Sequence, residues 1–306
     1  MGTFEGKGWS TMTSFRNIKE LVELAEKENK KISQIMIEQE MAVSGRSREE
    51  IWTNMSNAFD IMEKAVIRGI REDVHSHSGL TGGDAKKLQE YINKGNFLSG
   101  ATILDAVSKA MATNEVNAAM GIICATPTAG SAGIVPGCLF SVSDKLSAST
   151  EDKINFLFTA GAIGYCIANN AMIAGATGGC QAETGSAAAM AAAAIVEMAG
   201  GTPAQSAQAL SIALQNMLGL VCDPVAGLVE VPCVKRNAIG ASIAMVAADM
   251  ALAGIQFIIP ADEVIDAMYR IGKGMPHTLK ETALGGLAAT PTGKALQERI
   301  FGKPSS

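Results

Sequence analysis

The sequence is poor in aromatic residues, in histidine and in positive charge. Aromatic side chains make up only 5% of its 306 residues, and there are 3 histidines. Lysine and arginine total 25 against 30 aspartates and glutamates, which gives a net charge of −5. A nucleic-acid-binding protein usually carries a basic surplus and stacking aromatics. These deficits argue against a nucleic-acid partner and against a histidine-rich zinc site.

Several short motifs and a secretion signal are also missing. The chain contains no G-x-G-x-x-G, G-x-x-x-x-G-K-[ST], G-x-S-x-G, H-E-x-x-H or C-x-x-C. No apolar run of signal-peptide length opens the sequence, and the polar, glycine-rich residues 1–13 are interpreted as a leader or tail. We therefore expect a cytoplasmic protein whose six cysteines are reduced, since structural disulfides are rare in that compartment.

The distribution of apolar residues indicates an all-α fold with few or no strands. Hydrophobic residues make up 48% of the chain, which is typical of a folded globular protein. A helical period predicts one multi-helix domain over residues 14–302, with a subdomain break near 140–150. The segment 125–138 is expected to be a flexible loop. The expected helices cover approximately residues 16–41, 48–70, 84–93, 102–120, 150–173, 186–200, 203–220, 236–257 and 261–271.

Two apolar segments raise the question of a membrane. Residues 238–259 are long enough to span a bilayer, but they contain Asp249, which is costly in lipid. Residues 157–178 contain Asn169 and Asn170, and no aromatic belt flanks either segment. Buried helices of a large α-domain explain both segments better than membrane insertion.

The six cysteines differ in their sequence settings. Cys166 lies within an apolar helical segment and is interpreted as a core residue. Cys180 follows two glycines at a helix break, and Cys222 and Cys233 bracket a loop that contains proline and glycine. Their spacing matches no standard metal motif, so spacing alone leaves structural and metal-binding roles open, as it does for the loop cysteines Cys124 and Cys138. Three thiolates on one [4Fe–4S] cluster would leave one iron open as a Lewis acid.

Five segments carry a resemblance to a known family over nearly the whole chain, residues 14–302. They resemble the alpha subunit of the iron–sulfur-dependent L-serine dehydratases, and the GGCQAE and CDPVAGLVEVPC blocks are the most specific. The segments are SGLTGGD (78–84), NEVNAAMGIICATPTAGSAGIVPG (114–137), GGCQAETGSA (178–187), NMLGLVCDPVAGLVEVPCVKRNAIGAS (216–242) and GGLAATPTG (285–293).

The resemblance implies a cofactor and a reaction. In the family, the cysteines that match Cys180, Cys222 and Cys233 bind a [4Fe–4S] cluster. The implied reaction converts L-serine into pyruvate and ammonia without pyridoxal phosphate, as in serine degradation and gluconeogenesis. A Lewis-acidic iron suits this reaction, because hydroxide is a poor leaving group. The family's single-chain members carry an additional N-terminal portion, and some end in a cysteine. This sequence has neither, which implies a separate beta subunit with an ACT-type domain.

Further residues receive weaker assignments. Thr126, Thr128 and Ser131 are candidates for binding the substrate carboxylate, and the competing interpretation of their loop is an ordinary glycine-rich turn. Asn170 is a candidate for facing the site, and the competing interpretation is an amide that satisfies buried backbone groups. Glu183 and Asp223 adjoin the cysteines and could orient them. Lys235 and Arg236 could pair with a carboxylate, or lie in solvent. His75 and His77 are interpreted as exposed loop residues rather than general bases, and no base is assigned.

Two other functions are kept as alternatives. One is a related iron–sulfur lyase that acts on L-threonine or L-cysteine. The other is a non-catalytic helical scaffold whose cysteines pack or hold a structural metal.

Overall fold

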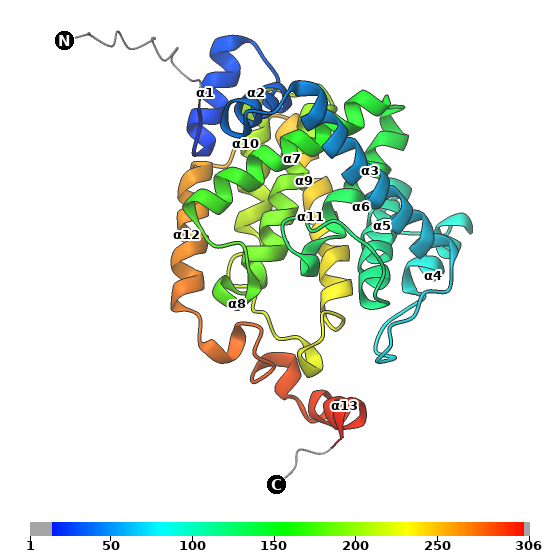
Figure 1. Ribbon diagram of the computed structural model, residues 1–306. Coiled ribbons are helices and arrows are strands. Elements are labelled where there is room, and N and C mark those ends of the chain that lie inside the picture. Colours follow the sequence, from blue (N-terminus) through cyan, green and yellow to red (C-terminus); the bar gives the residue numbers. More distant parts are fainter. Residues whose placement is uncertain (1–13, 303–306) are drawn as a thin grey trace, which may run out of the picture.

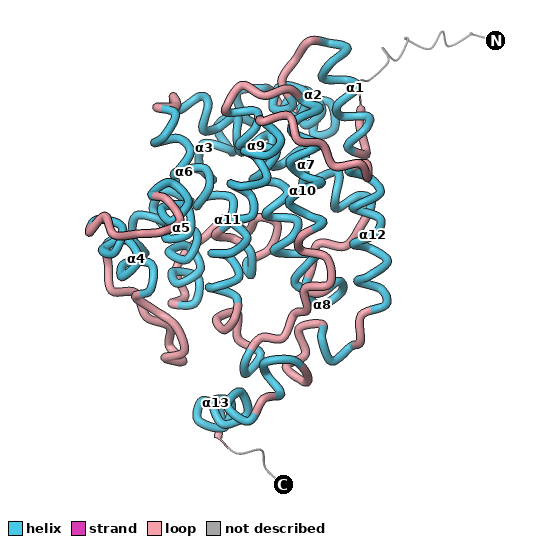
Figure 2. Tube along the Cα trace, turned by 180° about the vertical axis from the view of Figure 1, so that it is seen from behind, coloured by secondary structure: helices cyan, strands magenta, loops and turns pink. Residues whose placement is uncertain are grey.

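The computed structural model describes residues 14–302. Within that range the protein has 13 α-helices and no β-strand, which confirms the predicted all-α fold (Figures 1 and 2). The proposed leader, residues 1–13, lies outside the described residues. The helices are α1 (Ile18–Glu28), α2 (Ile32–Ser44), α3 (Arg48–Arg71), α4 (Asp84–Asn93), α5 (Ala101–Ala118), α6 (Ile134–Leu146), α7 (Thr150–Asn170), α8 (Gly175–Gly178), α9 (Ser186–Met198), α10 (Pro203–Gln215), α11 (Cys233–Leu252), α12 (Ala261–Gly274) and α13 (Pro291–Phe301).

Helix α9 forms the centre of the molecule. Every residue from Ser186 to Glu197 is buried, and α6, α7, α10 and α11 pack around it. Seven of the thirteen residues in its sequence SAAAMAAAAIVEM are alanines. Because alanine side chains are short, neighbouring helices approach closely, and a helix that is apolar on all sides is stable only when it is buried.

Capping side chains fix several helix starts. Ser47 and Glu50 form a reciprocal capping box at the start of α3, and Thr202 and Gln205 do the same for α10. In each box the side chains bind backbone N–H groups that the first turn leaves without partners. Cys166 is buried in α7, in agreement with its interpretation as a core residue.

Two local predictions were wrong. The helix expected over 16–41 is divided into α1 and α2, because Asn29 adopts the left-handed conformation (φ 52°) and ends α1. The flexible loop expected over 125–138 ends early, because α6 begins at Ile134. Pro136 lies in the first turn of α6, where its missing N–H costs nothing. Gly137 lets α6 pack closely on α5, since a Cβ there would lie 2.7 Å from the Ala106 carbonyl oxygen.

The segments that were weighed as membrane spans correspond approximately to α7 and α11. Among residues 14–302, no helix combines the length and the apolar character that crossing a bilayer requires. The subdomain break proposed near 140–150 lies at the end of α6 and the start of α7, and it stays a prediction.

Candidate metal and substrate site

Two of the three predicted cysteine ligands lie together with a glutamate. Cys180, Glu183 and Cys222 are buried, and each offers a ligand atom within 4.8 Å of those of the other two. Cys180 and Glu183 lie around the break between α8 and α9, beside α12 (Figure 1). Cys222 follows α10 in the chain. Two thiols and a carboxylate form a donor set that suits a thiophilic metal centre.

A buried glutamine holds these two segments in register. The Gln181 backbone N–H donates to the Leu220 carbonyl at 2.9 Å, and its Oε1 accepts from the Gly219 N–H at 2.9 Å. Its Nε2 also donates to the carbonyls of Gly178 and Met268, each at 3.0 Å. The residues 181–185 form a π-helical turn, a feature that often marks functional sites. Gln181 thereby fixes Cys180 opposite the segment that carries Cys222.

Gly175 has no side chain, and the side chains of Glu183 and Cys222 occupy the space beside it. A Cβ at this position would lie 2.8 Å from Glu183 Oε2 and 2.9 Å from Cys222 Sγ, closer than real Cβ atoms approach other atoms. The carboxylate of Glu183 also accepts hydrogen bonds from the Gly175 backbone N–H and from the Thr128 hydroxyl. A glycine is therefore required here for steric reasons, and the donor atoms fill the space where its side chain would be.

The two thiols differ in acidity. A hydrogen bond from the Cys222 thiol lowers the pKa of Cys180, and the positive charge of Arg236 lowers it further, although burial opposes both effects. The same hydrogen bond raises the pKa of Cys222, as does burial. Cys180 is consequently the thiol of this pair that ionises first.

Arg236 connects the two cysteine-bearing segments. Its NH1 lies 3.5 Å from Cys180 Sγ and 2.8 Å from the Val221 carbonyl oxygen. Its NH2 lies 2.8 Å from Asp223 Oδ1, and the Leu287 N–H donates to the other Asp223 oxygen at 2.7 Å. The sequence left two roles open for Arg236, pairing with a carboxylate or lying in solvent. The structure shows that it pairs with the carboxylate of Asp223. The sequence suggestion that Asp223 orients its neighbours is consistent with this contact.

Cys233 lies outside the group of three ligand atoms. It is buried at the first residue of α11, one helical turn before Arg236 and therefore on the same side of the helix. Burial raises the pKa of its thiol most, and the negative charges of Cys180 and Glu183 raise it further. Cys233 is thus close enough to Cys180 and Glu183 for their negative charges to act on its thiol.

The loop between α5 and α6 contributes one side chain to the site. Thr128 reaches Glu183, whereas the Thr126 and Ser131 hydroxyls donate to the Ala132 and Thr126 carbonyls within the loop. Asn237 of α11 holds this loop, since its Nδ2 donates to the Gly130 carbonyl at 2.7 Å. Substrate binding by these three hydroxyls stays a prediction.

The remaining candidates have other partners. Asn170 ends α7, and its Nδ2 donates to the carbonyls of Arg16 and Cys166 at 2.7 and 2.8 Å. His75 is exposed and lies 3.0 Å from Asp73, and His77 is exposed as well. Lys235 forms an ion pair with Asp84 at the start of α4. A substrate contact by Asn170 also stays a prediction.

Glu281 was not among the predicted site residues, yet it lies beside Cys222. Its backbone N–H donates to the Cys222 carbonyl at 2.7 Å, and the Cys222 N–H donates to the Leu279 carbonyl at 2.9 Å. Residues 279–281 therefore lie directly beside Cys222. The only available sequence signal was position, because Glu281 precedes the GGLAATPTG segment by four residues.

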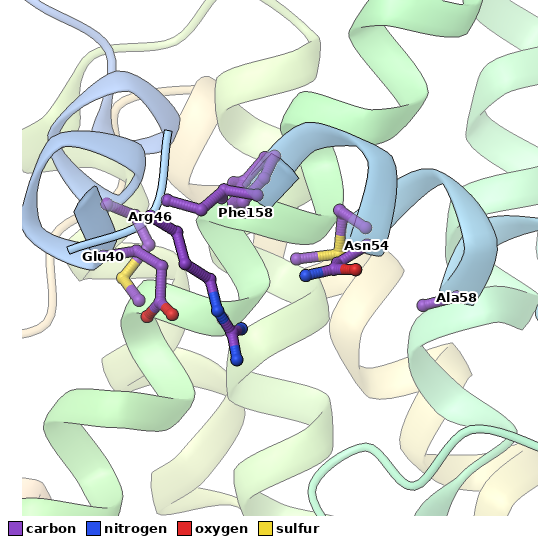
Figure 3. A pocket seen from close by; sticks show the side chains of 9 residues that line it. Glu40, Arg46, Asn54, Ala58 and Phe158 are labelled. Carbon is purple, nitrogen blue, oxygen red and sulfur yellow. The ribbon is translucent and has the colours of Figure 1, made fainter. Parts of the chain in front are cut away.

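A separate cavity of about 240 Å³ lies between α2, α3 and α7 (Figure 3). Met36, Ile51 and Phe158 are among the residues that line it. The side chains of Glu40 and Arg46, which line it too, lie side by side (Figure 3). None of the six cysteines lines it, so it is distinct from the candidate metal site.

The chain is similar to several known proteins. A family model described as "Serine dehydratase alpha chain" matches residues 27–288. A probable L-serine dehydratase alpha chain of Bacillus subtilis is 67% identical over 288 residues, which cover 94% of this chain and 96% of that protein. The L-serine dehydratase alpha chain of Peptoniphilus asaccharolyticus is 42% identical over 91% of this chain and 96% of its own. An L-serine dehydratase of Streptomyces coelicolor is 39% identical over 90% of this chain but only 60% of its own length.

Proposed function

The chain belongs to the serine dehydratase alpha chain family, and from that premise we propose that it converts L-serine into pyruvate and ammonia in the cytoplasm. The observation that carries this proposal is the buried group of Cys180, Glu183 and Cys222, which lies within the family match. It supports a lyase with a metal centre over a scaffold whose cysteines only pack, because three ligand atoms of the kinds that bind metals converge in this buried group.

The metal centre that we propose is a [4Fe–4S] cluster held by Cys180, Cys222 and Cys233. The donor chemistry fits, since thiolates are the usual ligands of such clusters and two of the three cysteines lie together in the buried group. A bound cluster with one open iron would supply Lewis acidity to the β-hydroxyl leaving group. No pyridoxal phosphate is required, and the nearby Lys235 is engaged with Asp84.

The residues of this chain have separate tasks in the proposed reaction. Arg236 holds Cys180 and Asp223 in place, and Gln181 aligns the two cysteine-bearing segments. Thr128 and the loop around it, anchored by Asn237, lie on the Glu183 side of the site, where their hydroxyl and N–H groups are placed to bind the substrate carboxylate.

A second chain completes the proposed enzyme. The relatives from Bacillus and Peptoniphilus are named as alpha chains, and the Streptomyces protein extends well beyond the matched region. We infer a separate beta subunit with an ACT-type domain, in a hetero-oligomer, and a general base that either chain could supply. A preference for L-threonine or L-cysteine is the alternative within the same class.

The test is the iron and acid-labile sulfide content of the anaerobically reconstituted protein, prepared with its partner chain. We expect about four of each per wild-type chain, and loss of both in Cys180→Ser. The control is Cys124→Ser, which changes a half-buried thiol outside the group. Pyruvate release from L-serine should follow the cluster content and fall on aeration, and L-threonine and L-cysteine serve as competing substrates. Wild-type protein without iron, or Cys180→Ser with full iron, would refute the assignment.

A further inference from the structure

Glu281 is held beside the site by backbone pairing. Its N–H donates to the Cys222 carbonyl, and the Leu279 carbonyl accepts from the Cys222 N–H, so residues 279–281 run parallel to the chain at Cys222. The Thr282 hydroxyl donates to the His277 carbonyl and closes the same turn. These contacts fix Glu281 relative to the cysteine rather than leaving it on a free loop.

The backbone at Glu281 is unusual for a glutamate. Its φ is 59°, in the left-handed region that glycine and asparagine tolerate better than other residues. Ala283, two residues later, has φ 58°. Such conformations persist only where the surroundings determine them, and they are concentrated at ligand-binding and active sites. A glutamate, a residue type that this conformation does not favour, thus lies beside the candidate metal ligand Cys222.

The Glu281 carboxylate has no hydrogen-bond or ion-pair partner among residues 14–302. Its charge nevertheless reaches the site: burial raises the pKa of Glu183 and of Cys233 most, and the charge of Glu281 adds to the increase in both. The other charged groups nearby are engaged. Glu183 accepts from Thr128 and Gly175 within the metal donor set, and Arg236 is paired with Asp223.

We propose that the Glu281 carboxylate binds the α-ammonium group of the amino-acid substrate. This inference rests on the proposed function, because it requires an amino acid at the site. The ammonium group is a compact cation that requires a negatively charged partner once it leaves water. Glu281 is the carboxylate beside Cys222 that remains free to provide one. It would therefore distinguish an α-amino acid from the corresponding hydroxy acid.

The experiment compares steady-state kinetics of the reconstituted holoenzyme for Glu281→Gln, Glu281→Asp and Glu281→Gly. The glycine variant removes the carboxylate while suiting the positive φ, so it covers the case in which the glutamine variant fails to fold. Glu298→Gln on α13 is the matched control, since its carboxylate is exposed and distant in sequence from every site residue. Iron and sulfide are measured in each preparation.

We expect Glu281→Gln and Glu281→Gly to raise KM for L-serine by at least about tenfold. Their iron and sulfide contents should equal those of wild type, and Glu281→Asp should retain part of the affinity. A KM within about twofold of wild type in the folded variants would overturn the inference. So would a change in KM that only follows loss of iron. If the wild-type holoenzyme releases no pyruvate from L-serine, the proposed function fails instead.

Discussion

The ion pair between Arg236 and Asp223 should contribute strongly to stability because it is removed from water. Arg236 NH2 lies 2.8 Å from Asp223 Oδ1, and the two side chains are 16% and 3% exposed. Replacing Arg236 with methionine keeps much of the side-chain volume but leaves the Asp223 carboxylate buried without its cation. Breaking one side of a buried pair costs about 3–5 kcal/mol. We expect the Arg236→Met variant to lose a free energy of unfolding within this range.

A double-mutant cycle separates the ion pair from the packing of the arginine side chain. Asp223→Asn removes the buried charge and leaves an oxygen that accepts from the Leu287 N–H, a bond of 2.7 Å in the native chain. The double variant should therefore be more stable than the sum of the single changes predicts, with a coupling energy of about 2 kcal/mol. The free energies come from urea unfolding followed by circular dichroism, provided that the m values stay constant.

Either of two results would refute this reasoning. A loss below about 1 kcal/mol for Arg236→Met would place the pair among solvent-screened surface contacts. A coupling energy near zero would mean that the arginine stabilises the protein only through its contacts with Cys180 and the Val221 carbonyl.

Four further outcomes are expected. Gly161→Ala should stabilise the chain by about 1 kcal/mol, because Gly161 lies inside α7 with nothing within 4 Å of an added Cβ. In the same urea assay, Gly137→Ala in α6 should destabilise the chain. The added Cβ at Gly137 would lie 2.7 Å from backbone atoms of Ala106 and Ala110. Gly175→Ala should lower the iron content of reconstituted protein without preventing folding, as measured by iron analysis and circular dichroism. Ser149→Ala should cost about 1 kcal/mol at pH 7 by removing the cap of α7. The hydrogen bonds from Ser149 lower the pKa of Asp152 below its ordinary 3.8, so the part of this stability that the Asp152 carboxylate contributes is present above pH 3.8 and should disappear as pH falls further, which unfolding at several pH values would show.

The fold could be predicted from the sequence where periodicity and caps agree. Residues 48–70 show both, and α3 spans Arg48–Arg71. The sequence was less informative where glycine and proline serve packing rather than turns. The composition of the segment 125–138 favours a loop, yet Gly133 and Gly137 are glycines because α6 lies against α5. A Cβ at Gly133 would be 2.0 Å from the Ala110 carbonyl oxygen. That reason depends on a neighbouring helix that local sequence does not identify.

The site could be predicted only in part, for a related reason. Cys180 and Cys222 were chosen through the resemblance, and the structure brings their sulfur atoms together. Gln181, Gly175 and Glu281 were not chosen, because their importance lies in contacts across long sequence separations. The bond between the Gln181 N–H and the Leu220 carbonyl is an example. No local pattern marks a residue whose partner lies 39 positions away in the chain.

An all-helical protein can build such a site only where its helices are interrupted. Inside a helix the backbone N–H and C=O groups bind one another and cannot position a neighbouring segment. Cys180 follows the break after α8, Cys222 lies between α10 and α11, and Cys233 is the first residue of α11. At these places free backbone groups pair across segments, as Cys222 does with Leu279 and Glu281. The rigid, alanine-rich α9 and its neighbours then hold the interruptions at fixed positions, so that the loops carry the chemistry and the helices determine its geometry.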